Sequence, residues 1–122
     1  MKKLLKIVLV SSITLLFFSC YYDEFPADDD EVVLPPDQEI SFSNDIAPIF
    51  VDYNCAQCHN GSQNPDLRPG NEYNSLVPAY VTPGNASGSR FYTFLAADGH
   101  RNVDNASLAL IEKWIDDGAE NN

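Results

Sequence analysis

The chain carries the stretch Cys55-Ala56-Gln57-Cys58-His59. Its C-x-x-C-H spacing is that of a c-type haem attachment motif, in which each thiol forms a thioether bond with one haem vinyl group. The histidine that follows the second cysteine can then bind the iron as the proximal ligand. The stretch therefore predicts one covalently attached haem c, held by Cys55, Cys58 and His59.

Two other chemistries also use paired cysteines. A thiol–disulfide redox pair of this spacing belongs to an alternation of strands and helices, which the hydrophobic pattern of this chain does not show. A zinc site would need two further ligands, and the only other histidine is His100. The residues therefore favour haem attachment over both alternatives.

The first 19 residues are typical of an export signal. Three lysines precede an apolar run over residues 7–18, which is shorter than the about 20 residues that a membrane-spanning helix requires. The run ends in Ser19-Cys20, which resembles the lipobox of bacterial lipoproteins. We therefore expect a signal peptide over residues 1–19 and a lipid on Cys20, although a chance cysteine beside an ordinary cleavage site would look the same.

The remaining chain divides into a predicted tether, residues 20–39, and a predicted single domain, residues 40–122. From Tyr21 to Glu39 the chain has eight acidic residues, three prolines and no basic residue, so this segment should repel itself and stay extended. The three cysteines are accounted for by one lipid and one haem, which leaves none for a disulfide. We expect an exported protein, lipid-anchored to a membrane and facing the periplasm or the cell surface.

The charge of the chain limits its partners. The net charge is −11 at pH 7, and removal of the signal peptide would take away three of the seven basic residues. Such an acidic surface repels nucleic acid and anionic lipid headgroups. It suits a redox partner protein with a basic docking surface, although solubility alone would also explain the charge.

Hydrophobic periodicity and capping residues predict an all-α domain of three to four helices. The expected helices are residues 44–53 with Asp45 as N-cap, residues 73–77 before Pro78, a segment around residues 91–95 capped by Asn85 or Ser87, and a last helix capped by Asp104 or Asn105, with Leu108, Ile111 and Ile115 in one stripe and Gly118 after its end. A domain of roughly 80 residues has a thin core. The haem would serve as an apolar staple, so we expect the haem-free domain to be poorly folded.

Several segments beyond the haem motif carry a resemblance to one family. They are Phe42–Phe50, Cys55–Gly61, Pro83–Asn85, Ser89–Tyr92 and Ile111–Ala119. With these segments the chain resembles the small monohaem cytochrome c domains of the planctomycete and Bacteroidetes lipoprotein type. The resemblance implies a class I-like cytochrome c fold around one covalently attached haem. It also implies a role as a one-electron carrier.

The chain departs from this family at the distal iron ligand. The family has a methionine before the last helix, whereas the only methionine here is Met1. His100 lies in the corresponding region, residues 96–102. Either His100 is the distal ligand, or the distal side is open or filled by another group. Ligation by two histidines would give a lower reduction potential than histidine with methionine.

Two other functions stay open. A five-coordinate haem could sense a small gas or have weak peroxidase-like activity. Alternatively, the haem could be the staple of a structural module within a larger complex. No paired carboxylates, nucleophile elbow or phosphate-binding loop indicate an enzyme.

Overall fold

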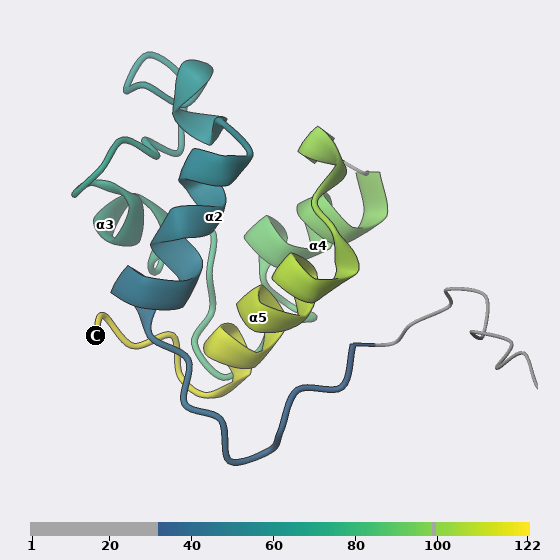
Figure 1. Ribbon diagram of the computed structural model, residues 1–122. Coiled ribbons are helices and arrows are strands. Elements are labelled where there is room, and N and C mark those ends of the chain that lie inside the picture. Colours follow the sequence, from purple (N-terminus) through teal and green to yellow (C-terminus); the bar gives the residue numbers. More distant parts are fainter. Residues whose placement is uncertain (1–31, 99) are drawn as a thin grey trace, which may run out of the picture.

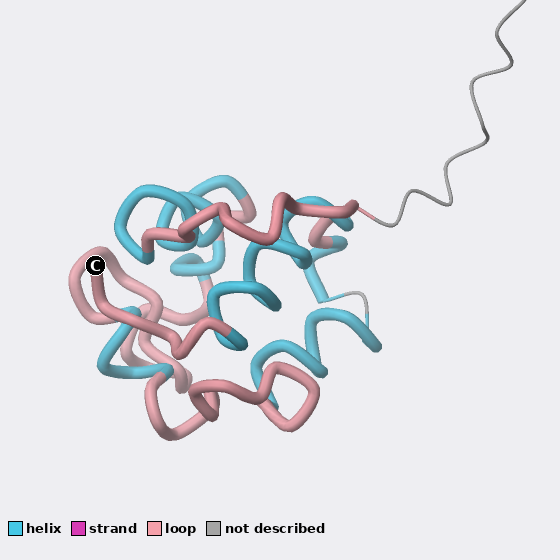
Figure 2. The backbone as a smooth tube through the Cα atoms, turned by 90° about the horizontal axis from the view of Figure 1, so that it is seen from below, coloured by secondary structure: helices cyan, strands magenta, loops and turns pink. Residues whose placement is uncertain are grey.

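The structure is a computed structural model that describes residues 32–98 and 100–122. These residues form helices and loops without a β-strand (Figures 1 and 2). The predicted all-α class is therefore confirmed for this part of the chain. The predicted signal peptide and Cys20 lie outside the described residues and stay predictions.

Four α-helices and three short π- or 3-10-helical segments follow one another along the described chain. Their bounds are Phe42–Ile46 (the π-helical turn η1), Ala47–Asp52 (α2), Cys55–Gln57 (the 3-10 turn η2), Glu72–Leu76 (α3), Arg90–Asp98 (α4), His100–Asn102 (the 3-10 turn η3) and Asn105–Asp116 (α5). Figure 1 shows α4 next to α5, on the opposite side of the molecule from α3. None of the helices in this part of the chain is long and apolar enough to cross a membrane.

The first helical segment begins earlier than predicted. Its N-cap is Ser41, whose hydroxyl accepts a hydrogen bond from the backbone N–H of Asn44 at 3.3 Å. The carboxylate of Asp45 accepts in turn from the backbone N–H of Ser41 at 2.8 Å. The prediction of Asp45 as N-cap was wrong, because Asp45 is the returning half of a reciprocal cap. Pro48 lies in the first turn of α2, where a missing N–H is tolerated.

Helix α4 also begins at a different residue. It starts at Arg90, so the prediction that Asn85 or Ser87 caps it was wrong. The side chain of Asn85 instead closes the preceding turn, where its Oδ1 accepts from the backbone N–H of Gly88 at 2.9 Å. The buried hydroxyl of Ser89 then donates to the Asn85 carbonyl at 2.8 Å. An asparagine that favours a turn therefore marked the turn before the helix and not the helix itself.

Helix α5 confirms the predicted last helix. The carboxylate of Asp104 accepts from the backbone N–H of Ser107 at 2.7 Å and caps the helix. Gly118 follows the C-cap with φ of +114°, a conformation that favours glycine. Ile111 and Ile115 are fully buried, and Leu108 beside them is partly buried, so the predicted stripe faces the core. The short helix α3 is likewise confirmed within one residue of its predicted bounds.

Three aromatic rings join the first and last helical segments, and we call them the aromatic core. The ring centres of Phe42 and Trp114 lie 5.3 Å apart, and those of Phe42 and Tyr73 lie 5.2 Å apart. The polar atoms of these rings are satisfied, because Trp114 Nε1 donates to the Glu120 carbonyl and the Tyr73 hydroxyl donates to the Ala119 carbonyl, both at 2.9 Å. The chain after α5 is thereby tied back onto the core.

The last residues of the predicted tether touch the domain. Leu34 packs against the core, and the Pro36 carbonyl accepts a hydrogen bond from Lys113 Nζ at 3.3 Å. The described chain from residue 32 onward therefore runs along α5 before it enters η1 (Figure 1).

Candidate haem-binding site

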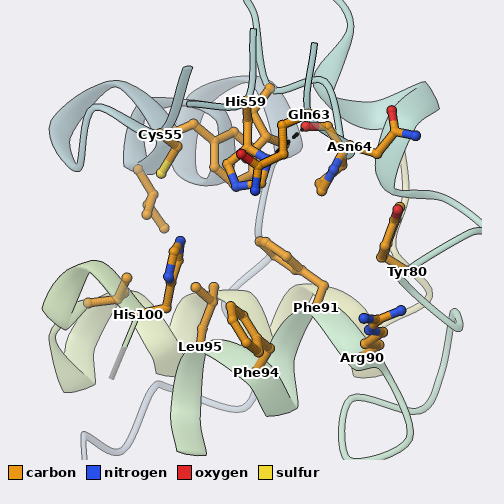
Figure 3. Close-up of a pocket in the computed structure, with 15 residues that line it drawn as sticks. Cys55, His59, Gln63, Asn64, Tyr80, Arg90, Phe91, Phe94, Leu95 and His100 are labelled. Atoms are coloured by element: carbon orange, nitrogen blue, oxygen red, sulfur yellow. Dashed lines mark hydrogen bonds between the residues drawn. The ribbon is translucent and has the colours of Figure 1, made fainter. Parts of the chain in front are cut away.

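A cavity of about 250 Å³ lies between the segment that follows α2 and helix α4 (Figure 3). This volume is close to the lower limit of about 300 Å³ for pockets that enclose small ligands. The apolar part of the lining comprises Ile49, Phe50, Leu67, Phe91, Phe94, Leu95 and Val103. Phe94 is 48% exposed, so the lining reaches the protein surface. The cavity therefore suits a largely apolar ligand with one side open to solvent.

His59 presents one free ring nitrogen to this cavity. Its Nδ1 lies 3.0 Å from the carbonyl oxygen of Pro65 (Figure 3). A carbonyl oxygen can only accept, so Nδ1 donates this hydrogen bond and Nε2 is the ring nitrogen left for a ligand. Histidines that bind metals usually donate their other ring N–H to a carbonyl or carboxylate in this way. The structure thus orients His59 so that its Nε2 could bind a metal or a haem iron.

The carbonyl that orients His59 is itself held in place. It belongs to the peptide group between Pro65 and Asp66, and the N–H of that group donates to Ser75 Oγ at 2.6 Å. The Asp66 carboxylate pairs with Arg68 at 2.6 Å, and this interaction lowers the pKa of Asp66 to about 2. The loop that follows His59 is therefore fixed both to α3 and within itself.

His100 enters the cavity from the side opposite His59 (Figure 3). The two ring centres lie 6.3 Å apart, and the ring planes form an angle of 80°. Two imidazoles bound to one metal from opposite sides, each at a metal–nitrogen distance of about 2 Å, would have ring centres roughly 6 Å apart. The ring of His100 also packs on Phe94, with centres 5.1 Å apart. The separation of the two histidines therefore fits one iron between them.

The two cysteines of the motif differ in exposure. Cys55 lines the cavity and is partly buried, whereas Cys58 is exposed at the end of η2 and does not line it; both are free thiols. Burial raises the pKa of the Cys55 thiol, and the charge of Arg101 offsets part of that rise. Arg101 Nη2 also lies 3.7 Å from Cys58 Sγ, and this contact connects η3 to the haem motif. Three of the four predicted haem-binding residues, Cys55, His59 and His100, thus meet at one cavity.

The donor set suits a haem better than a bare ion. Across residues 32–98 and 100–122 there is no group of three histidine, cysteine, aspartate or glutamate side chains that could hold a metal ion. Zinc in proteins takes four ligands, mostly from such side chains. A haem supplies the equatorial nitrogens itself and needs only axial ligands from the protein, which His59 and His100 offer.

The polar end of the cavity was not anticipated from the sequence. Asn64, Tyr80 and Arg90 line the end that lies away from Cys55 (Figure 3). The Arg90 guanidinium carbon lies 6.0 Å from the centre of the Tyr80 ring. The positive charge of Arg90 could have indicated a binding residue. Because the start of α4 was predicted at the wrong residue, the sequence did not show that Arg90 faces the cavity. The Pro65 carbonyl is a backbone group, and no residue type in the sequence indicates its role.

Comparison of the chain with protein-family models, with curated proteins and with solved structures found no match. The function is therefore argued from the haem motif and from the geometry of the cavity.

Proposed function

We propose that this protein is a membrane-tethered c-type cytochrome with one haem, which carries single electrons between partner proteins. One observation carries the proposal: directly after a C-x-x-C pair, His59 points a free Nε2 into an apolar cavity while its Nδ1 bonds to Pro65. A haem bound there would supply one-electron redox chemistry at its iron.

Each residue of the site has a separate task. Cys55 and Cys58 would anchor the haem covalently, and His59 and His100 would be its axial ligands. The Pro65 carbonyl fixes the tautomer and the ring orientation of His59. A ligand held in this way would move little when the iron of a bound haem changed its charge, which would favour fast electron transfer.

The surroundings of the cavity suit electron exchange with a partner. The walls of the cavity are largely apolar, and the exposed side chain of Phe94 marks where the site reaches the surface. An acidic protein of this kind would dock a basic partner briefly and in a salt-dependent manner. The predicted lipid on Cys20 would keep this exchange at a membrane.

The decisive experiment is a redox-titrated visible and near-infrared spectrum of protein made together with a haem-maturation system. We expect haem that resists acid–acetone extraction, a low-spin spectrum in both oxidation states, and a reversible one-electron titration. Absence of covalent haem would overturn the proposal. A high-spin ferric spectrum, with carbon monoxide binding that displaces no ligand, would instead favour the gas-sensing or peroxidase-like alternative.

A further inference from the structure

We propose that Arg90 and Tyr80 bind the carboxylates of the haem propionates and so fix the end of the haem that lies away from the cysteines. This inference rests on the proposed function. It starts from the two ends of the cavity, which carry different chemistry (Figure 3). Cys55 and His100 lie toward one end, and Tyr80 and Arg90 lie at the other.

A haem has two unlike edges. One edge carries the vinyl groups that react with cysteine thiols, and the opposite edge carries two propionate carboxylates. If the thiols of Cys55 and Cys58 hold the vinyl edge, the carboxylates must point toward the other end of the cavity. The side chains at that end are a guanidinium, a phenol and the amide of Asn64, all of which can donate hydrogen bonds to a carboxylate.

The charge of Arg90 has no other partner in the described part of the chain. Residues 32–122 contain four basic residues against twelve acidic ones. Arg68 and Lys113 form ion pairs with carboxylates, and Arg101 contacts the haem motif. Within residues 32–98 and 100–122, Arg90 pairs with no carboxylate and instead lies near the ring of Tyr80. A guanidinium that lies beside a cavity and has no carboxylate partner is well suited to bind a carboxylate with two parallel hydrogen bonds.

The position of Arg90 in its helix supports the same conclusion. It is the first residue of α4, where the positive end of the helix dipole disfavours a cation. Helix stability therefore does not explain an arginine at this position. An anion beside Arg90 would be stabilised both by the guanidinium and by the positive end of the helix dipole. The backbone N–H of Phe91 donates to the Tyr80 carbonyl at 3.0 Å, and this bond keeps the arginine and the tyrosine together.

The test compares Arg90→Gln with Lys113→Gln in the haem-loaded protein. Both variants remove one positive charge, but Lys113 lies on α5 and bonds to Asp117 and Pro36, away from the cavity lining. In Arg90→Gln we expect a lower reduction potential, because loss of a nearby cation favours ferric iron. We also expect a shift of the propionate bending band in the resonance Raman spectrum. The covalent haem content should not change, because the thiols hold the haem.

Two further variants keep the test independent of folding defects. Tyr80→Phe and Arg90→Lys preserve the charge of the site, and each should shift the propionate band because it alters one donor. Equal potentials and equal Raman bands in Arg90→Gln and Lys113→Gln would overturn the inference. If Arg90→Gln does not fold, unshifted bands in both charge-preserving variants would overturn it. A parent protein without covalent haem would show that the proposed function itself has failed.

Discussion

The two halves of the domain differ in what completes their packing. In one half, which we call the packed half, η1, α3 and α5 surround the aromatic core, and Trp114 is only 1% exposed. In the other, the cavity half, residues 55–67 and helix α4 face each other across a cavity of about 250 Å³. The packed half is completed by its own side chains, whereas the cavity half places apolar side chains around space that a ligand would fill.

The size of the cavity shows why this difference matters for stability. At about 24 cal/mol per Å³, a closed cavity of about 250 Å³ would forgo roughly 6 kcal/mol, and this cavity forgoes less because one side is open to solvent. Small domains have a total stability of about 5–15 kcal/mol. We therefore expect a haem that fills the cavity to contribute a sizeable part of the stability of this small domain.

The largest effect should come from preventing haem attachment. In the double variant Cys55→Ala/Cys58→Ala we expect no haem after acid–acetone extraction. We also expect a broad, low-temperature unfolding transition by circular dichroism, because the cavity half has no ligand to pack on. Parent protein made without the haem-maturation system is the matched control and should melt in the same way. A sharp, near-native transition in either sample would show that the cavity half folds without haem.

A change in the packed half should weaken folding without changing the haem. Trp114→Ala removes the largest fully buried side chain, which should lower the free energy of unfolding by about 3–5 kcal/mol. The visible spectrum of the folded protein should stay low-spin, since Trp114 does not line the cavity. Val51→Ala is the exposed control and should change stability by less than about 0.5 kcal/mol. Urea titration of the haem-loaded proteins would measure the free energy of unfolding of both variants. Loss of the low-spin spectrum in Trp114→Ala would contradict the division of the domain into a packed half and a cavity half.

Replacing His100 should change the iron more than the fold. His100 is exposed and its ring lies near those of Phe94 and His59, whereas Trp114 is fully buried, so His100→Ala should destabilise the domain less than Trp114→Ala. We expect a high-spin ferric spectrum after loss of the distal ligand. His100→Met should restore a low-spin spectrum with a higher reduction potential, because thioether ligation favours reduced iron. A spectrum and potential unchanged in His100→Ala would remove His100 from the ligand set.

Local signals explain which parts of the fold could be predicted from the sequence. Asp104 and Gly118 mark the ends of α5 because capping and a positive φ depend on neighbouring residues only. The first helical segment was misplaced because Ser41 and Asp45 are both good N-caps, and the sequence does not show which one receives the first bond. The start of α4 was missed because Asn85 forms a turn as readily as it caps a helix.

The candidate site, too, could be predicted only where a local sequence pattern marks it. The C-x-x-C-H spacing predicted haem attachment at Cys55, Cys58 and His59, and the structure places Cys55 and His59, but not Cys58, in the lining of one largely apolar cavity. The sequence pointed to His100 only through the family resemblance, and its distance from His59 and the position of Arg90 beside Tyr80 depend on how α4 and η3 pack against distant residues. Contacts of that kind come from tertiary structure, and a single sequence does not contain them in a local pattern.

The smallest effect should come from Asp104, which lies where the two halves join, between η3 and α5. Hydrogen bonds from the Ser107 N–H and from the Tyr53 hydroxyl lower the pKa of the Asp104 carboxyl in the folded state. The ionised cap therefore stabilises the fold above about pH 4, the usual value for an unfolded aspartate, and this contribution is lost as the pH falls through the folded pKa.

We expect Asp104→Ala to lower the free energy of unfolding by about 1 kcal/mol at pH 7, and by less at pH 3. Asp104→Asn keeps a capping oxygen without a charge, so its deficit at pH 7 should be the smaller of the two. Urea titrations of the three haem-loaded proteins at both pH values would measure these differences. A deficit in Asp104→Ala that is equal at pH 7 and pH 3 would contradict a role for the ionised cap. The low-spin spectrum should persist in both variants, because a bond from His100 to iron would hold η3 in place even when the start of α5 is weakened.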